Sequence, residues 1–441
     1  MTEKKKHLQS IHVQHNKYTA GCETEIMPIP DFVYISMSQH IGTPCKPLVA
    51  KGDYVKVGQP IGDTDAFVSV PIHSSVSGIV TGIEGVRSGN GGNDTIVIIE
   101  ADKKQELWDG IQVPKVNNRK EFVKAVRTSG LVGLGGASFP THIKYNPKNI
   151  DEVTTLIVNG AECEPFITSD HRLMLEETEN IISGMLLVMK FLELEEGFIG
   201  IEDNKPDAIE AINNMIIQKG SPNIKVVPLR SRYPQGAERV MVYEVTGKTM
   251  DAGVLPAELG IILSNVTSIA FLGQHFKDGI PLINKRITVD GNAVSRPANV
   301  MCPIGTKIAD VIEFCGGYKE EPKKILMGGP MMGRAIFTDQ MPVIKNNNAI
   351  LAFAGEQAWV KEETACINCG RCYKACPFKL MPTALSSAVQ RKDAEALERF
   401  KVMQCMECGS CSYICPARRP LSFNNKLGKA ILKEAQSNNG K

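Results

Sequence analysis

Eight cysteines near the end of the chain have a type and a spacing that can do chemistry. Residues 366–377 have the sequence CINCGRCYKACP, and residues 405–416 have the sequence CMECGSCSYICP. Each run follows the pattern C-x2-C-x2-C-x3-C-P, in which three thiolates bind one [4Fe–4S] cluster and the fourth binds the other. The pattern therefore predicts two adjacent [4Fe–4S] clusters, which transfer one electron at a time.

The same spacing predicts which cysteines share a cluster. One cluster is expected on Cys366, Cys369, Cys372 and Cys415, and the second on Cys405, Cys408, Cys411 and Cys376. Gly370 and Gly409 allow the backbone to fold closely over the sulfurs. Zinc is the alternative metal, but structural zinc sites usually take two separated pairs of ligands, and here four cysteines crowd into eleven residues. We therefore expect iron.

The other five cysteines are scattered through a long chain, which argues against a disulfide framework and for a reducing cytoplasm. They are expected to be small buried apolar side chains: Cys22, Cys45, Cys163, Cys302 and Cys315.

Charge is nearly balanced over the whole chain but not at its end. The formal net charge of +2 over 441 residues gives no reason to expect a nucleic-acid partner. Residues 366–441 carry 13 Lys and Arg against 5 Asp and Glu. These cations either offset the charge of the clusters and thiolates or dock an acidic redox partner, and both interpretations stay open here.

A glycine-rich stretch is a candidate ligand site. Residues 130–145 have the sequence GLVGLGGASFPTHIKY, in which Gly133, Gly135 and Gly136 leave backbone N–H groups accessible to a flat or phosphorylated ligand. Lys144 follows at a distance suited to a phosphate. The spacing matches neither the dinucleotide nor the P-loop fingerprint, so a plain loop is an equally good interpretation of this stretch alone.

That stretch belongs to a region, residues 115–280, in which strand-like and helix-like segments alternate. Strands are expected at residues 154–160, 197–203 and 224–230. The alternation predicts a mostly parallel sheet with ligands beyond the carboxyl ends of its strands. Three polar loops belong to this region, each of which alone is equally a solvated turn: VNGAECEP (158–165), YPQGAER (233–239) and LSNVTS (263–268).

Smaller units flank this region. Residues 46–105 have short β-like stretches similar to the biotinyl and lipoyl carrier fold, but the expected hairpin tip has no lysine, so a structural module is expected. Residues 284–345 combine a hairpin signal at Asp290-Gly291 with a capped helix, which predicts a β-grasp-like module. Apolar residues between the cysteine runs have helical spacing, and the final KLGKAILKEAQSNNGK is expected to be a plain surface helix.

Taken in order, these segments resemble known redox proteins. Residues 130–270 resemble the flavin- and NADH-binding subunit of respiratory complex I, whose own cluster motif is replaced here by the double cysteine run. Nearly the whole chain resembles the C-subunit family of the Rnf complex, an ion-translocating ferredoxin:NAD+ oxidoreductase of bacteria.

The resemblance implies a multidomain α/β protein. The expected parts are an N-terminal segment with a lipoyl-like β-sandwich (1–112), a Rossmann-like FMN/NADH domain (113–282), a β-grasp (SLBB-like) module (283–348) and a helical two-cluster ferredoxin-like domain (349–441).

The resemblance also implies cofactor contacts. FMN is expected on Gly133, Gly135, Gly136, Lys144 and Asn159, with Ser264 and Asn265 near its phosphate or ribityl chain. Phe139 is expected to stack on the nicotinamide nucleotide. Glu164, Tyr233 and Glu238 are expected to line the dinucleotide pocket, and Glu162 and Gly236 are expected among the cofactor-binding residues. The chain departs from the complex I pattern at Ala161 and Ala237, where acidic residues are usual.

The implied function is hydride exchange between NAD(H) and FMN, followed by one-electron transfer through the two clusters, with no side chain acting as nucleophile or base. Expected partners are an iron–sulfur ferredoxin-like subunit and integral membrane subunits, and no nucleic acid. We expect neither a secretory signal nor a spanning helix. The resemblance to a subunit of a membrane-bound complex implies a peripheral location on the cytoplasmic face of the cell membrane.

Two alternatives remain open at this point. The chain could be a flavin and iron–sulfur cobalamin reductase of bacterial microcompartments, although no shell-targeting tail is apparent. It could also be a non-catalytic iron–sulfur scaffold whose glycine loop binds nothing. The coupled ion (Na+ or H+), the physiological direction and the choice between NAD and NADP are equally open.

Overall fold

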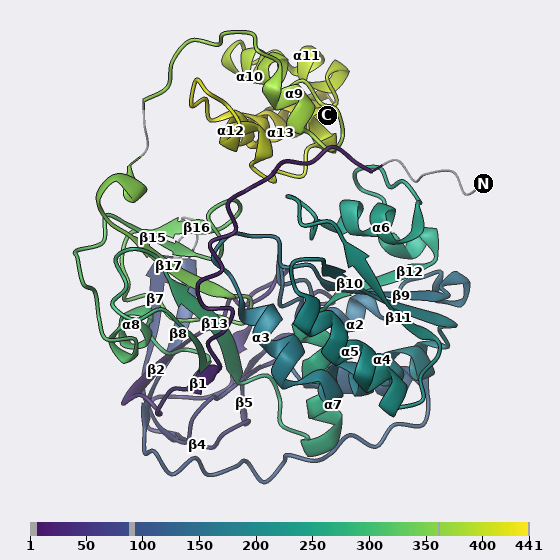
Figure 1. Cartoon of the computed structure of the whole chain (residues 1–441). Helices are drawn as coiled ribbons and strands as arrows, with labels where there is room; N and C mark the ends of the chain where they lie inside the picture. Colours follow the sequence, from purple (N-terminus) through teal and green to yellow (C-terminus); the bar gives the residue numbers. More distant parts are fainter. Residues whose placement is uncertain (1–6, 88–92, 360–361, 440–441) are drawn as a thin grey trace.

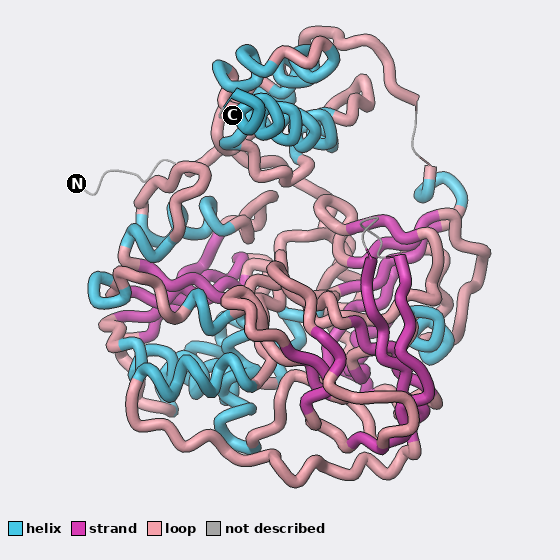
Figure 2. The backbone as a smooth tube through the Cα atoms, turned by 180° about the vertical axis from the view of Figure 1, so that it is seen from behind, coloured by secondary structure: helices cyan, strands magenta, loops and turns pink. Residues whose placement is uncertain are grey.

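The computed structural model describes residues 7–87, 93–359 and 362–439. Figure 1 shows a large body in which a β-rich half lies beside an α/β half, with a small helical domain above both. The view from behind in Figure 2 shows the same division, with strands mixed with helices on the left and a β-rich half on the right.

The first β-rich unit is the barrel domain (residues 32–101). One sheet has the order β2-β8-β7-β4, and a smaller sheet has the order β3-β5-β6. The strands are β2 (Phe32–Ser36), β3 (Lys46–Pro47), β4 (Tyr54–Val55), β5 (Pro60–Asp63), β6 (Ile72–His73), β7 (Gly78–Arg87) and β8 (Asn93–Ala101). Alternate residues of these strands, among them Val33, Ile35 and Val97, are fully buried between the sheets. The expected small β module is confirmed.

The α/β domain (residues 119–278) is built on a parallel sheet with the order β11-β10-β9-β12. The strands are β9 (Thr155–Gly160), β10 (Glu196–Glu202), β11 (Ile224–Leu229) and β12 (Ile261–Asn265). The helices are α1 (Arg119–Thr128), α2 (Thr141–Lys144), α3 (Ser169–Glu176), α4 (Thr178–Leu192), α5 (Pro206–Gln218), α6 (Glu238–Thr246) and α7 (Val266–Asp278), with 3-10 turns at Ile150–Glu152 and Pro256–Leu259.

Two glycines allow α4 and α7 to pack closely in this domain. A Cβ on Gly184 would lie 2.0 Å from the Ile269 carbonyl oxygen, and a Cβ on Gly273 would lie 2.1 Å from the Asn180 carbonyl oxygen. The predicted α/β alternation with a parallel sheet is confirmed. Helices α4 and α7 lie so close together that no side chain fits between them at these two glycines.

The β-grasp domain (residues 284–353) has a sheet of order β1-β14-β13-β17-β15-β16. Its elements are β13 (Asn284–Asp290), β14 (Ala298–Pro303), α8 (Ile308–Phe314), β15 (Lys324–Met327), β16 (Arg334–Ile336) and β17 (Ala349–Phe353), and β1 (Thr24–Ile26) joins from the N-terminal segment. A 3-10 turn at Gly355–Ala358 follows.

Three details of this domain can be compared with expectation. Ala349–Phe353, expected to begin the cluster domain, is the buried strand β17, which pairs with β13 and β15. The hairpin signalled at Asp290-Gly291 is present, since β13 and β14 pair antiparallel, but its connection is longer than a two-residue turn because β14 begins only at Ala298. Helix α8 has no side-chain cap at its N-terminus, where the Thr306 hydroxyl donates back to the Pro303 carbonyl. At its other end, Gly316 and Gly317 adopt left-handed conformations and donate to the Glu313 and Ile312 carbonyls, as in a glycine C-cap.

The cluster domain (residues 362–439) is helical. It contains α9 (Arg371–Ala375), α10 (Pro382–Gln390), α11 (Ala394–Arg399), a 3-10 turn at Val402–Gln404, α12 (Ser410–Tyr413) and α13 (Leu421–Asn439). Leu385, Leu397 and Leu432 form its core. The surface helix expected at the end of the chain is α13: it packs one face along α10 and α11, where Leu432 is buried, and leaves Lys426, Lys433 and Glu434 exposed.

The N-terminal strap, residues 7–27, connects these units. In Figure 1 it runs from below the cluster domain down to the β-grasp sheet. Ile11 forms a β-bridge with Tyr233 of the α/β domain, and β1 pairs with β14. In the described part of the chain, no helix is long and apolar enough to cross a membrane.

Candidate functional site

The glycine loop, residues 133–139, lies against the start of α7. The Leu134 N–H donates to the Ser268 hydroxyl (3.1 Å), and the Gly133 N–H donates to the Phe139 carbonyl (2.9 Å). A Cβ on Gly135 would lie 2.6 Å from Asn265 Nδ2, so only glycine fits there. Gly135, Gly136 and Phe139 are exposed. The helix N-terminus beside this open loop favours an anion such as a phosphate.

Two more predicted residues lie at the carboxyl end of β12. Lys144 Nζ donates to the Leu263 carbonyl oxygen (2.8 Å), and burial lowers the pKa of Lys144 from its usual value. The Ser264 hydroxyl lies 3.1 Å from the Tyr145 hydroxyl. Glu238, the first residue of α6, partly opposes the lowering of the Lys144 pKa through its charge. These side chains therefore gather around one edge of the sheet.

The loop after β9 is tied to the same edge. Asn159 Nδ2 donates to the Gly236 carbonyl oxygen (2.7 Å). The Glu162 carboxylate accepts from the backbone N–H groups of Asp170 (2.6 Å) and His171 (3.2 Å), and so caps α3. Burial raises the pKa of Glu162 to about 7. The Glu162 carboxylate is therefore buried and accepts hydrogen bonds within the protein.

The structure adds Asp170, which the sequence analysis missed. Its carboxylate accepts from Asn265 Nδ2 (2.8 Å) and from the Thr267 hydroxyl (2.6 Å), and so joins α3 to the N-terminus of α7. An aspartate in the first turn of a helix is an ordinary sequence feature, so no sequence signal distinguished it.

Glu164 and Tyr233, which were expected to line the dinucleotide pocket, contact the β-grasp domain and the cluster domain. Glu164 Oε2 accepts from the Met331 N–H of the β-grasp domain (3.0 Å), and burial raises the pKa of Glu164 to about 7. Tyr233 is 1% exposed, and its hydroxyl donates to the Cys408 carbonyl oxygen (2.7 Å). The expectation that Tyr233 lines an open dinucleotide pocket does not fit, because the N-terminal strap and the cluster domain cover it.

The cysteines form two groups that mix the two runs. Cys376 of the first run lines one pocket together with Cys405, Cys408 and Cys411 of the second. Cys415 of the second run lies in the electrostatic environment of Cys372, together with Cys366. We call the first group the inner site (Cys376, Cys405, Cys408, Cys411). The second group, to which Cys369 is added from the spacing of its run, is called the outer site (Cys366, Cys369, Cys372, Cys415).

The backbone around these sulfurs suits clusters held by thiolates. The N–H groups of Leu380 and Glu407 donate to the sulfurs of Cys376 and Cys405 (both 3.4 Å), and hydrogen bonds of this kind stabilise cluster ligands. The two runs repeat the same left-handed residues at matching positions: Asn368 and Glu407, Gly370 and Gly409, Lys379 and Arg418. Among the described residues, no group of His, Cys, Asp or Glu side chains is arranged to hold a single metal ion.

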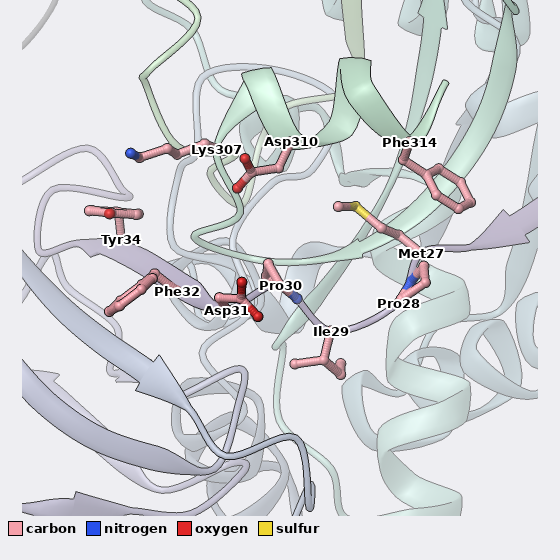
Figure 3. A pocket seen from close by; sticks show the side chains of 10 residues that line it. All are labelled: Met27, Pro28, Ile29, Pro30, Asp31, Phe32, Tyr34, Lys307, Asp310 and Phe314. Carbon is pink, nitrogen blue, oxygen red and sulfur yellow. The ribbon is translucent and has the colours of Figure 1, made fainter. Parts of the chain in front are cut away.

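A separate cavity of about 440 Å³ lies where the barrel domain meets α8 (Figure 3). Asp31 and Asp310 reach into it, and the Lys307 ammonium lies 4.3 Å from the centre of the Tyr34 ring. None of the predicted cofactor residues lines this cavity.

Four family models match the chain in the order of its domains. They describe an RnfC barrel sandwich hybrid domain (residues 6–104), the Nuo51 FMN-binding domain (126–274), an SLBB domain (286–335) and a 4Fe-4S dicluster domain (358–416).

Curated relatives match most of the chain. The C subunit of the proton-translocating ferredoxin:NAD(+) oxidoreductase complex of Clostridium ljungdahlii is 44% identical over 88% of this chain and 85% of its own length. The C subunit of the Na(+)-translocating complex of Acetobacterium woodii is 40% identical over 91% of this chain and 90% of its own. The chain belongs to the RnfC family.

A third RnfC relative matches over a similar length, and one solved structure has a similar fold. The C subunit of the ion-translocating oxidoreductase complex of Rhodobacter capsulatus is 37% identical over 97% of this chain and 83% of its own. An NAD+-reducing [NiFe]-hydrogenase in the H2-reduced state matches with a TM-score of 0.50 and 16% identity, over 72% of this chain and 61% of that one, which indicates a shared fold.

As an RnfC protein, the chain has an FMN-binding domain and a 4Fe-4S dicluster domain. The FMN-domain match spans the glycine loop, the loop after β9 and the start of α7. A Cβ on Gly136 would meet no atom within 4 Å, so the backbone of the glycine loop is open beside the N-terminus of α7, which fits a bound flavin phosphate.

Proposed function

We propose that this chain is the subunit at which NAD(H) exchanges hydride with FMN, and that electrons pass singly between FMN and the inner and then the outer cluster. When bound, FMN exchanges electron pairs with nicotinamide and single electrons with iron–sulfur clusters. The rest of the complex is expected to supply ferredoxin chemistry and ion movement.

The contact between Tyr233 and Cys408 carries this proposal. Tyr233 belongs to the α/β domain, and its hydroxyl donates to the carbonyl oxygen of an inner-site cysteine (2.7 Å). Beside it, Arg239 donates to the Gln404 carbonyl oxygen (3.0 Å). The α/β domain therefore contacts the loop that carries the inner site.

The outer site has an exposed edge. Cys369 is exposed, and Ile367 beside it is 67% exposed. Arg371, Lys374 and Arg418 surround the outer site as exposed cations. This surface supports an acidic iron–sulfur subunit as the redox partner, with integral membrane subunits holding the chain at the cytoplasmic face of the membrane.

The residues of this chain would bind the flavin and the nicotinamide nucleotide and orient them toward each other. The glycine loop and the N-terminus of α7 would hold the flavin phosphate, with Lys144 nearby as a cation. Phe139, which is exposed beside the loop, would stack on the nicotinamide nucleotide. No side chain is needed as nucleophile or base, because the hydride passes directly between the two ring systems.

The test is an anaerobic preparation analysed for iron, zinc and flavin, followed by rapid mixing with NADH. We expect about eight irons and one FMN per chain, without zinc. NADH should bleach the flavin first and reduce the clusters afterwards. A protein that retains its iron but neither holds nor rebinds FMN would instead be a cluster-carrying scaffold.

The charged surface around the outer site, where the redox partner is proposed to bind, has its own test. Electron transfer from the reduced protein to an acidic ferredoxin should slow as salt concentration rises, because salt screens exposed charges. Flavin bleaching by NADH in the same samples should not follow that salt dependence. A salt-independent transfer rate would assign the cations of the cluster domain to offsetting cluster charge.

A further inference from the structure

The N-terminal strap carries a lysine into the loop that follows β9. Lys17 Nζ donates to three backbone carbonyl oxygens: those of Glu162 (2.8 Å), Glu164 (2.8 Å) and Ile167 (2.5 Å). Three converging carbonyl oxygens form a cation site, and the ammonium group fills it. The residue comes from a segment about 145 positions away along the chain.

The loop from 162 to 167 has a backbone that needs such support. Glu162 and Phe166 both adopt left-handed conformations, with φ of 52° and 70°. Residues other than glycine hold this conformation only where their surroundings enforce it. Without the ammonium group, the three carbonyl oxygens would also lose their shared partner.

The charges around Lys17 come from several elements. Burial lowers the pKa of Lys17 to about 8, and Lys205 before α5 also lowers it, whereas the carboxylates of Glu162 in the loop and Glu202 in β10 raise it. Lys205 in turn donates to the Ala161 carbonyl oxygen (2.8 Å) and to Glu202 (3.2 Å). Removing the charge of Lys17 therefore disturbs a buried group of two acids and two bases.

A continuous set of contacts joins this loop to the flavin edge. The Glu162 carboxylate caps α3 through the N–H of Asp170 (2.6 Å). The Asp170 carboxylate holds Asn265 Nδ2 (2.8 Å), and Asn265 lies directly against Gly135 of the glycine loop. A displacement of the loop thus reaches the glycine loop through α3.

We propose that Lys17 is a positioning residue, whose ammonium group acts as a built-in cation that orders residues 162–167 and thereby completes the flavin site. This inference rests on the proposed function, since it presumes that FMN binds at the glycine loop. It assigns a role to the N-terminal strap, which lies outside the matched FMN domain.

The experiment measures FMN binding to flavin-free protein that retains its clusters, by quenching of flavin fluorescence. Lys17→Ala should weaken binding about tenfold or more. Methylammonium should restore binding because it can donate to the three carbonyls, whereas tetramethylammonium at equal concentration should not. Lys51→Ala, an exposed lysine of the barrel domain, is the matched control and should bind FMN like the wild type.

Hydrogen exchange gives a second readout that does not depend on flavin. In Lys17→Ala and in Lys17→Met, amides of residues 161–170 should exchange faster, whereas amides of α10 and α13 should not change. Wild-type affinity in both variants would overturn the inference. Loss of iron or of folding in both variants would overturn it as well, because Lys17 would then support the whole chain. If the wild type itself binds no FMN, the proposed function fails instead.

Discussion

The guanidinium carbon of Arg239 lies 3.7 Å from the centre of the Phe378 ring, so a residue of α6 stacks on a residue of the cluster domain. The same guanidinium donates to the carbonyl (3.0 Å) and side-chain oxygens (2.8 Å) of Gln404, the residue before Cys405. Arg239 therefore holds the inner site against the α/β domain.

Replacing Arg239 should uncouple the clusters from the flavin. A stacked and hydrogen-bonded arginine of this kind contributes about 2 kcal/mol, so Arg239→Ala should lower the equilibrium constant for docking of the cluster domain by roughly tenfold or more. Rapid mixing with NADH should show flavin bleaching at the wild-type rate and slower cluster reduction. Arg239→Lys, which keeps the charge but loses the planar fork, should be intermediate. Equal slowing of both phases would contradict this role.

The mixed cysteine groups predict which substitutions act alike. Cys376→Ser should alter the electron paramagnetic resonance signal of the same cluster as Cys408→Ser, because both residues line the inner site. Cys415→Ser should alter the same signal as Cys369→Ser. Should Cys376→Ser instead resemble Cys369→Ser, each run would hold its own cluster and the assignment would be wrong.

Gly135 should tolerate no side chain even without flavin. In Gly135→Ala the new Cβ would lie 2.6 Å from Nδ2 of Asn265, whose Oδ1 caps α7, so the flavin-free protein should melt at a lower temperature and lose FMN binding. Gly136→Ala meets no atom within 4 Å and should leave the melting temperature of the flavin-free protein unchanged. Equal melting temperatures for both variants would show that the loop relaxes freely.

The buried carboxyl of Glu164 should make stability depend on pH. Burial raises its pKa from about 4.5 to about 7, so between these values the folded state binds more protons than the unfolded state and stability falls as pH rises. Glu164→Gln removes this loss and should gain up to about 3 kcal/mol above pH 7, with no gain near pH 4. Thermal unfolding at a series of pH values measures the difference. Glu210→Gln, an exposed change on α5, should show no such trend.

Much of the fold could be predicted from local patterns. The apolar runs of β9, β10 and β11 and the proline at the start of α5 mark their elements because burial and helix initiation leave local traces in sequence. Strand β17 was assigned to the wrong domain, since its apolar residues indicate burial but not which sheet they join.

The sequence by itself determined the chemistry: the spacing of eight cysteines and of a glycine loop specifies cluster ligands and a close backbone approach over a few residues. Only the tertiary structure decided which distant residues and domains contact one another. It buries Tyr233 under Cys408, joins Asp170 to Asn265 and inserts Lys17 into the loop after β9. These contacts join residues up to 175 positions apart, and no local pattern records them, because they depend on how separately folded units pack against one another.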